Sequence, residues 1–486
     1  MFEKEVNLLL KKIDLIGKEQ YQSLDEFAWR FHIAEKDVYL VGGCVRDLLL
    51  NKKPKDFDFC TPLKPEEVKA LFKKEKPIDG ETRYDFIDTG LKHGTITIYD
   101  KRFKIGYEVT TFRVDGKYDD GRHPNEVTFT PSLEEDLKRR DFTINSFAYD
   151  IKNRKLIMLD ESYLRDLEYG IIRTVGNPID RFNEDALRML RALRFMAQLN
   201  FSIEENTYSA IKALNSKLSM ISKERIRDEL TKILLSDTPQ VLELVIESGL
   251  ETYMFDGLTP LTDMLRCEHQ NPWHYTDVFH HTMDVVKRVP KTFVLRWAAL
   301  FHDFGKPATK TLKEGTTDHY NYHGHQDVSV EIATKIMDIL KFPNYEKDLI
   351  LKYVKYHDTD LVECKNSKFK QVVADIGVDN FLGLIKLKAS DSAAHNITKD
   401  TKWSISYISK LYDRFSQVVI EDQALKVTDL AINGNDIIAD GFLQGKEIGD
   451  CLRWMLEIVL EHPEYNTREK LLEFLQTFKE MSFQST

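Results

Sequence analysis

Strand-like sequence patterns are concentrated in the first 150 residues, and this asymmetry constrains the fold most strongly. VYLVGG (38–43), HGTITIYD (93–100) and EVTFTP (126–131) carry apolar, β-branched or alternating residues, as strands of a sheet do. Two helix-like stretches lie among them, at 44–51 and 65–74. We therefore expect an α+β chain: a mixed sheet with helices on one face, followed by helical domains.

The composition is that of a globular protein with more than one domain. The chain has 486 residues, too many for a single core, and is 42% hydrophobic and 30% charged. Its five cysteines are scattered without a CxxC pair, which favours a reducing compartment over a disulfide framework. The N-terminal stretch MFEKEVNLLLKKIDLIGKEQ predicts an amphipathic helix rather than a signal peptide. No apolar run reaches membrane-spanning length, so we expect a cytoplasmic protein that does not engage a membrane.

Two carboxylates lie one residue apart in the segment DFDF (56–59). Side chains two apart on a strand share a face, so Asp56 and Asp58 are expected on one face, with Phe57 and Phe59 in the core. Neighbouring carboxylates repel each other unless a cation lies between them, and Mg²⁺ prefers carboxylate and phosphate oxygens. A solvated edge strand or turn is the more common explanation of such a pair when it stands alone.

The glycine pair Gly42 and Gly43 changes that interpretation. It lies where a strand is expected to pass into a helix that begins near Cys44. Glycine lets the backbone approach a phosphate closely, and free N–H groups at a helix start attract anions. Arg46 lies on the first helical turn. A glycine pair alone indicates a tight turn, but glycines, arginine and paired carboxylates together predict a phosphate site beside a metal site.

Two later segments combine charged side chains with helical spacing. In KRRDFTIN (138–145), Asp141 is expected to cap a helix. In NEDALRMLRALRF (183–195), Asp185 and Arg188 are three residues apart and are expected to share a helix face. A surface ion pair of little energetic value is the ordinary explanation of the second pattern. Arginines recur at the same spacing at 188, 191 and 194.

Histidines are concentrated in one quarter of the chain. Ten of the fourteen lie between residues 269 and 395, far more than an even distribution would place there. A single histidine on an apolar face is ordinarily a core residue, but such a cluster with interspersed aspartates suits a transition-metal ion.

The segment VGGCVRDLLLNKKPKDFDFCT (41–61) resembles the head of the class II nucleotidyltransferases. This group contains the tRNA CCA-adding enzymes and the bacterial poly(A) polymerases. The resemblance continues through EVTTFRVDGKYDDGRHP (108–124), EEDLKRRDFTINSFAYD (134–150) and NEDALRMLRALRFMAQLNF (183–201), and it covers roughly the first 230 residues densely.

The resemblance implies roles for the head residues. Asp56 and Asp58 would be catalytic and hold two Mg²⁺ ions, which activate the RNA 3′-hydroxyl and stabilise the leaving pyrophosphate. Glu108 is either a third acidic group or an ordinary exposed strand residue. The implied nucleotide-binding residues are Gly42, Gly43, Arg46, Arg113, Arg140, Asp141, Asn145, Glu184, Asp185, Arg188 and Arg191. Among these, the resemblance assigns Asp141 and Asn145 to the ribose and Arg140 to phosphate.

The family assigns base selection to Glu184, Asp185 and Arg188. Cytosine and adenine both present an exocyclic amine beside a ring-nitrogen acceptor, whereas guanine and uracil present a carbonyl beside an N–H. An aspartate acceptor next to an arginine donor fits the first pair and rejects the second. Residues 113–124 would form a flexible loop anchored by Arg113, and His123 departs from the arginine that is frequent in the family there.

The histidine-rich quarter resembles the HD phosphohydrolase domain, and HDFGKP (302–307) matches that family's usual pattern. The implied ligands of a divalent transition metal are His281, His302, Asp303, His325, His357 and Asp391. We divide the chain accordingly into a head (1–150), a helical neck that binds RNA and the nucleotide base (151–265), an HD domain (266–400) and a helical tail (401–486).

The expected function is addition of C, C and A to the tRNA 3′ end from CTP and ATP. Three alternatives stay open: a poly(A) polymerase, an enzyme that adds CC only or A only, and an HD phosphohydrolase with a tRNA-binding head. The fused HD region and a C-terminus that is not strongly basic favour CCA addition over poly(A) synthesis.

Overall fold

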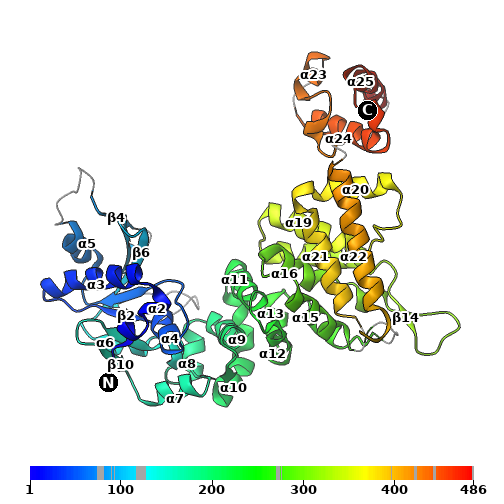
Figure 1. Cartoon of the computed structure of the whole chain (residues 1–486). Helices are drawn as coiled ribbons and strands as arrows, with labels where there is room; N and C mark the ends of the chain where they lie inside the picture. Colours follow the sequence, from blue (N-terminus) through cyan, green and yellow to red (C-terminus); the bar gives the residue numbers. More distant parts are fainter. Residues whose placement is uncertain are drawn as a thin grey trace. The chain divides into compact units, whose positions relative to one another are not determined.

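The computed structural model describes residues 1–73, 82–88, 90–91, 94–115, 127–269, 274, 276–395, 397–420, 424–441 and 445–483. The chain divides into two compact units (Figure 1). The first unit comprises Met1–Ile233 and Val241–Gly257, and the second comprises Leu234–Gln240 and Leu258–Thr486.

The first unit contains a mixed sheet, which confirms the prediction. In the described part of the chain it has eight strands in the order β1-β10-β9-β2-β3-β6-β5-β4. Strands β3 and β6 are parallel and the other neighbours are antiparallel. The strands are β1 (Phe2–Glu5), β2 (Tyr39–Val41), β3 (Asp58–Thr61), β4 (Tyr84–Ile87), β5 (Thr95–Asp100), β6 (Ile105–Thr111), β9 (Phe147–Asp150) and β10 (Lys155–Met158).

Aromatic side chains fill one face of this sheet. Phe59 of β3 and Tyr107 of β6 are buried and pack on Phe27 of α3 (Lys18–Ile33), with ring centroids 4.7 Å from it in both cases. Phe72 of α5 (Pro65–Lys73) joins them at 4.9 Å from Phe27. Because neighbours along a strand alternate in direction, Asp58 projects from the opposite face.

The opposite face is covered as well, so the expectation of helices on one face is wrong. Leu133 and Leu137 of α6 (Leu133–Lys138) pack with Val41, Cys60 and Ala148 from the strands. These strand residues are apolar and point away from α3, so this face also needs a cover.

The start of the chain departs from its sequence pattern. Phe2–Glu5 forms edge strand β1, which pairs antiparallel with β10, and short helices follow it at Leu8–Lys11 (α1) and Ile13–Ile16 (α2). All four strand residues are exposed, so no apolar alternation marked this strand.

Helices make up most of the rest of the first unit, as predicted. A two-residue parallel strand pair, β11 (Ile171–Ile172) with β12 (Ser202–Ile203), lies among them. The helices are α4 (Gly43–Leu49), α7 (Ser162–Glu168), α8 (Pro178–Glu184), α9 (Leu187–Leu199), α10 (Glu205–Leu214), α11 (Lys223–Leu234), α12 (Leu242–Glu247) and α13 (Leu250–Met254).

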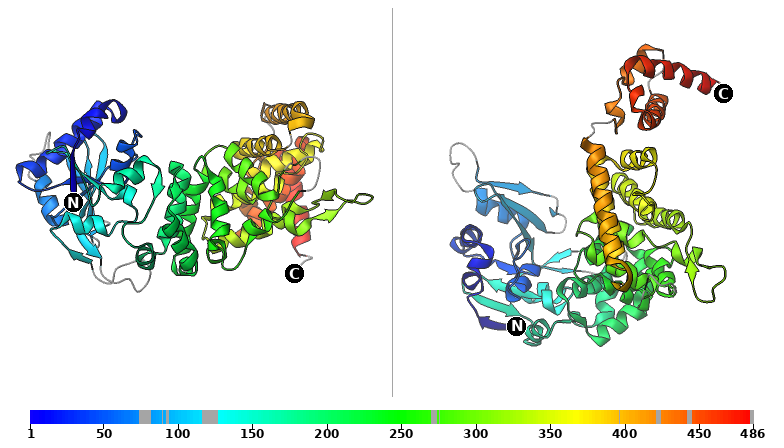
Figure 2. Two further views of the ribbon diagram at one scale, coloured as in Figure 1. Left: turned by 90° about the horizontal axis from the view of Figure 1, so that it is seen from below. Right: turned by 45° about the vertical axis from the view of Figure 1, so that its right-hand side comes forward.

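In its described residues, the second unit is helical apart from a short hairpin, β13 (Thr311–Leu312) with β14 (Tyr320–Asn321). Helices α15, α16, α19 and α21 pack on one another, and α22 runs along α21 (Figures 1 and 2). No described helix is long and apolar enough to cross a membrane. The helices are α14 (Pro260–Leu265), α15 (Val278–Arg288), α16 (Phe293–Phe301), α17 (Lys306–Thr309), α18 (His325–Ile339), α19 (Asn344–Tyr356), α20 (Asn366–Ile376), α21 (Val378–Ala393), α22 (Ile397–Ile420), α23 (Gly434–Ala439), α24 (Lys446–Glu461) and α25 (Arg468–Phe483).

Candidate active site and metal centre

The carboxylates of Asp58 and Glu108 come from neighbouring strands. Asp58 is the first residue of β3, and Glu108 is its register partner on β6, so both project from one face. Asp56 lies just before β3, so the expectation that both aspartates lie on the strand is wrong for Asp56. Burial, with the negative charges of Asp56 and Glu108, raises the pKa of Asp58 to about 6. Three carboxylates crowd one place, where a hard cation would relieve their repulsion.

A half-buried arginine lies against the glycine turn. Gly42 has a φ of 74°, and α4 begins at the next residue. A Cβ at Gly42 would stand 3.1 Å from Nη1 of Arg140. The charge of Arg140 also acts on Asp58, whose pKa it lowers in part. The turn, the guanidinium and the carboxylates therefore adjoin, and this arrangement suits a phosphate beside a metal ion.

Asp136 organises this basic group, and the sequence analysis did not single it out. Its side chain is fully buried and accepts hydrogen bonds from Arg139 at 2.7 Å and from Arg140 at 3.2 Å. It also accepts the backbone N–H of Arg113 at 3.4 Å. Burial alone would raise the pKa of Asp136, but the two guanidinium groups outweigh it and lower the pKa. Its place on α6, three and four residues before the two arginines, was the available signal.

Asp141 does not cap a helix, so that expectation is wrong. The chain forms a short 3-10 turn at Thr143–Asn145, and the side chain of Asp141 accepts hydrogen bonds from the backbone of Phe142 at 2.8 Å and from Asn145 at 3.2 Å. Its other oxygen accepts from Arg191 at 2.5 and 2.9 Å. Although burial opposes it, the charge of Arg191 holds the pKa of Asp141 well below its usual range.

The same network reaches the glycine turn through Arg46. Nη1 of Arg46 donates to Oδ1 of Asn145 at 2.7 Å. Four residues that the sequence analysis assigned to the nucleotide thus form one chain of contacts, in the order Arg46, Asn145, Asp141 and Arg191. Residues from α4, the 3-10 turn and α9 are held together in this way.

The base-selection residues lie at a break between two helices. Helix α8 ends at Glu184, Asp185 has extended φ and ψ of −141° and 104°, and α9 begins at Leu187. The expectation of one continuous helix through Asp185 and Arg188 is therefore wrong. One oxygen of Asp185 accepts the backbone N–H of Leu187 at 3.0 Å, and the other accepts from Arg225 at 2.9 Å.

Arg188 has different partners from Asp185. It donates to Glu184 at 2.5 Å and to the backbone oxygen of Arg139 at 3.1 Å. Farther along α9, Arg194 pairs with Glu229 of α11 at 3.0 Å, and both side chains are buried. Each of the arginines Arg188, Arg191 and Arg194 therefore pairs with its own carboxylate. Rotation of the side chain of Asp185 or Arg188 would break the hydrogen bonds described above.

The six predicted metal ligands of the second unit converge. His281 lies on α15 and Asp391 on α21; His302 and Asp303 follow α16, His325 begins α18 and His357 follows α19. Donor atoms fall into two groups, each within 4.8 Å of one another: His281, His302 and Asp391, and Asp303, His325 and His357.

Asp303 lies between these two groups. Its oxygens stand 3.2 Å from Nε2 of His302 and 3.4 Å from Nε2 of His325, and it pairs with Lys306 at 2.7 Å. Nε2 of His281 is 3.0 Å from Asp391. Burial would raise the pKa of Asp303, but the neighbouring His302 and Lys306 hold it well below its usual range.

Backbone carbonyls orient three of the imidazoles. Nδ1 of His302 contacts the oxygen of Ala299 at 2.7 Å, and Nδ1 of His357 contacts the oxygen of Val354 at 2.7 Å. His325 contacts Tyr322 in the same way at 2.9 Å. With Nδ1 held by a carbonyl, Nε2 faces the centre as an acceptor, as metal-binding histidines do. The donor set fits a transition-metal ion.

The chain is similar to known proteins over most of its length. Family models match three segments: a Poly A polymerase head domain over residues 38–173, a "Probable RNA and SrmB- binding site of polymerase A" over 200–262, and an HD domain over 275–376. A CCA-adding enzyme of Lactobacillus delbrueckii subsp. bulgaricus is 34% identical over 440 residues, which cover 90% of this chain and 93% of that protein. The chain belongs to the CCA-adding enzyme family. The expected family resemblance is confirmed.

Other CCA-adding enzymes are similar over part or all of the chain. That of Ligilactobacillus salivarius is 44% identical over 236 residues, which cover 47% of this chain and 55% of that protein. The crystal structure of the Bacillus stearothermophilus CCA-adding enzyme in complex with CTP superposes with a TM-score of 0.65 at 26% identity, covering 97% of this chain and 100% of that one.

The loop expected in CCA-adding enzymes at 113–124 is described only at its start. Arg113 begins β7 (Arg113–Asp115), which pairs antiparallel with β8 (Val127–Phe129). His123 lies outside the described residues, so the expectation at this position stays a prediction.

Proposed function

We propose that this protein adds C, C and A to tRNA 3′ ends from CTP and ATP. Family membership supports the activity. The grouping of Asp58, Glu108 and Asp56 beside the guanidinium of Arg140 supports these residues as the site of that activity. A nucleotide triphosphate needs this combination of carboxylates for a metal and a cation for its phosphates.

In this proposal Asp56 and Asp58 hold Mg²⁺, and Glu108 is close enough to contribute. Mg²⁺ bound there would stabilise charge on the attacking and leaving oxygens. Arg140 would bind phosphate oxygens, because Asp136 holds its guanidinium beside the glycine turn. The ribose contacts of Asp141 and Asn145 stay predictions, and a ribose would share these side chains with Arg191 and Arg46.

Base selection would rest on Asp185 and Arg188, with the protein in place of a nucleic-acid template. Arg225 and the N–H of Leu187 fix the acceptor, and Glu184 fixes the donor. A rigid acceptor beside a rigid donor discriminates well, because a base with the opposite pattern leaves buried polar groups unpaired.

The convergent histidines and aspartates of the second unit support a second candidate activity, metal-dependent phosphohydrolysis in the HD domain. The metal there would be a divalent transition ion. We keep the division into head, neck, HD domain and tail at residues 150, 265 and 400 as a proposal. All five cysteines are free thiols, which supports a cytoplasmic location.

A gel assay tests the proposed function. Purified protein is given tRNA that ends at the discriminator base, at C or at CC, with each labelled nucleotide alone and in combination, in Mg²⁺. Addition of CCA followed by a stop is the expected result. Addition of CC only or A only would make it part of a split system, and a long A ladder would make it a poly(A) polymerase. No incorporation would leave the HD site as the working one.

A further inference from the structure

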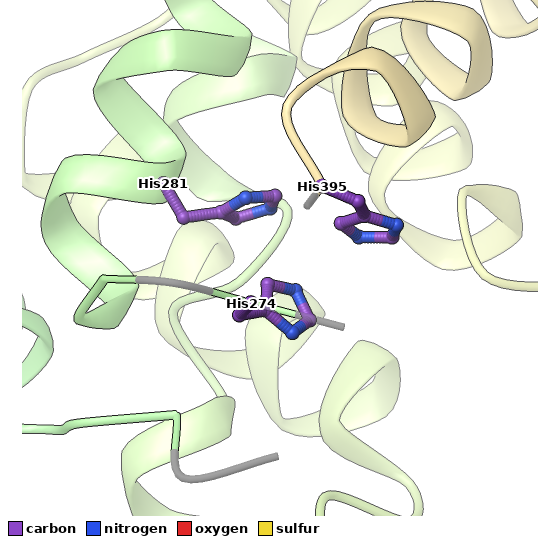
Figure 3. A group of neighbouring side chains, drawn as sticks. All are labelled: His274, His281 and His395. Carbon is purple, nitrogen blue, oxygen red and sulfur yellow. The ribbon is translucent and has the colours of Figure 1, made fainter. Parts of the chain in front are cut away.

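Three imidazoles form a group beside the predicted ligands of the HD site. His274 precedes α15, His281 lies on α15 and His395 follows α21, and Figure 3 shows their rings gathered at one place. Ring centroids are 4.8 Å apart for His274 and His281, and 4.5 Å for His274 and His395. One nitrogen of each ring lies within 4.8 Å of one nitrogen of each other ring.

His281 belongs to this outer group and to the inner one. It is only 1% exposed, and its Nε2 is 3.0 Å from Asp391. Its Nδ1 is buried without a hydrogen-bond partner among the described residues. A buried ring nitrogen without a hydrogen-bond partner destabilises the folded protein. A metal ion bound to this nitrogen would remove that destabilisation.

His269 acts as a support for His274 rather than as a ligand. The two rings stack with centroids 3.7 Å apart and planes at 12°. Both nitrogens of His269 are engaged: Nδ1 contacts the oxygen of Thr276 at 2.9 Å, and Nε2 contacts Nζ of Lys306 at 3.3 Å. Lys306 donates to Nε2, so Nδ1 carries the hydrogen and the ring is held in one tautomer. His274 therefore packs against a fixed surface.

We propose that His274, His281 and His395 bind a divalent transition-metal ion, additional to the ion of the inner HD site. His274 and His395 would bind as neutral imidazoles, and His281 would bridge the two ions as an imidazolate, with its ring N–H proton released to solvent. Nitrogen ligands of this kind suit borderline ions such as Zn²⁺, Co²⁺ and Ni²⁺, whereas Mg²⁺ prefers oxygen. A tetrahedral ion with bonds of about 2.0–2.1 Å holds its nitrogens about 3.3 Å apart, so the rings close by small side-chain rotations.

The fourth coordination position of this outer ion is open to a cavity. His274 and His395 line a cavity of about 350 Å³ together with Asp303, Asp391 and Lys306. A water or a phosphate oxygen in that cavity would complete the coordination. The outer site does not depend on CCA addition.

The test is the number of transition-metal ions that the full-length protein retains. Wild type and variants are loaded with Zn²⁺, dialysed, and analysed for zinc per chain by mass spectrometry; Co²⁺ loading adds a visible spectrum that reports tetrahedral coordination. His274→Gln and His395→Gln should each lose one ion per chain. His323→Gln should match wild type, because His323 lines the same cavity but belongs to neither group.

Two further variants separate this proposal from the inner site. His357→Gln should lose an inner ion and keep the outer one. His395→Cys should keep the outer ion, since a thiolate can replace an imidazole, and this variant guards against a merely unfolded His395→Gln. The proposal is overturned if His274→Gln and His395→Gln retain the wild-type zinc content, or if wild type retains no zinc. Circular dichroism verifies the fold of each variant, and labelled CTP incorporation tests the head independently.

Discussion

Asp58 on β3 and Glu108 on β6 are register partners in a parallel strand pair, and their carboxylates share one face with Asp56 at its edge. Parallel pairing of β3 with β6 places Glu108 beside Asp58, although fifty residues separate them in the sequence. The acidic group therefore depends on formation of the sheet. Burial of Asp58 and the negative charges of Asp56 and Glu108 together raise the pKa of Asp58.

Asp58→Asn should lower CTP incorporation by about 1,000-fold or more. Loss of a metal-binding carboxylate removes several kcal/mol of charge stabilisation, and each 1.4 kcal/mol is a factor of ten in rate. Without Mg²⁺ the variant should melt at a higher temperature than wild type, because one of three crowded charges is gone. Asp85→Asn, at an exposed position on edge strand β4, is the matched control. Near-wild-type incorporation by Asp58→Asn would exclude the proposed metal site.

Asp136→Asn should lower the free energy of unfolding by about 3 kcal/mol at pH 7, since two guanidinium groups lose a buried partner. The pKa of Asp136 is depressed in the folded protein, so its stabilising effect is present above the unfolded-state pKa of about 3.9 and is lost as the pH falls through the lower folded value. Urea unfolding should therefore show a gap between wild type and variant that is full at pH 7 and shrinks below about pH 4.

The control for this experiment is Glu134→Gln on the same helix, whose exposed pair with Lys138 should contribute little to stability. An Asp136→Asn protein as stable as the control, or a gap that does not change with pH, would contradict the anchoring role of Asp136.

Arg188→Ala and Asp185→Ala should relax base selection. Each removes a hydrogen bond that involves a charged group, worth about 1.5–3 kcal/mol, so the preference for CTP and ATP over UTP and GTP should fall by about 10- to 100-fold. The preference is measured as a ratio of kcat/KM values on tRNA that ends at C. Arg225→Ala should act in the same direction but more weakly, since Arg225 positions Asp185.

Lys212→Ala, on the exposed surface of α10, is the control for base selection. If the variants lose rate equally for all four nucleotides, then these residues support the fold of the neck and do not read the base.

Asp56→Ala and His302→Ala should separate the two candidate activities. The first should abolish nucleotide addition and leave hydrolysis of a 2′,3′-cyclic phosphate in the presence of Ni²⁺ or Co²⁺. The second should abolish that hydrolysis and leave addition, because His302 lies within the second unit. Loss of both activities in either variant would indicate one shared site.

Local sequence patterns predicted much of the fold and of the candidate sites. The mixed sheet, the helical remainder, and the burial of Phe57 and Phe59 were predicted correctly. The set of six metal-ligand candidates came from the resemblance to the HD phosphohydrolase domain, and these residues do converge. Strand β1 was not predicted, because an exposed edge strand carries no apolar alternation and is defined by its pairing with β10. Asp185 likewise leaves the helical pattern, since its side chain caps Leu187 and binds Arg225 from α11.

The sequence by itself determined which residue types are present and in what local order: a glycine turn, paired aspartates, an arginine row and clustered histidines. Only the tertiary structure decided which of these side chains contact one another. Asp136 gathers Arg139 and Arg140, Asp141 joins Asn145 to Arg191, and His274 meets His395 across more than a hundred residues. The reason is physical, because buried charged and polar groups must find partners, and which partner lies within reach depends on how distant helices and strands pack.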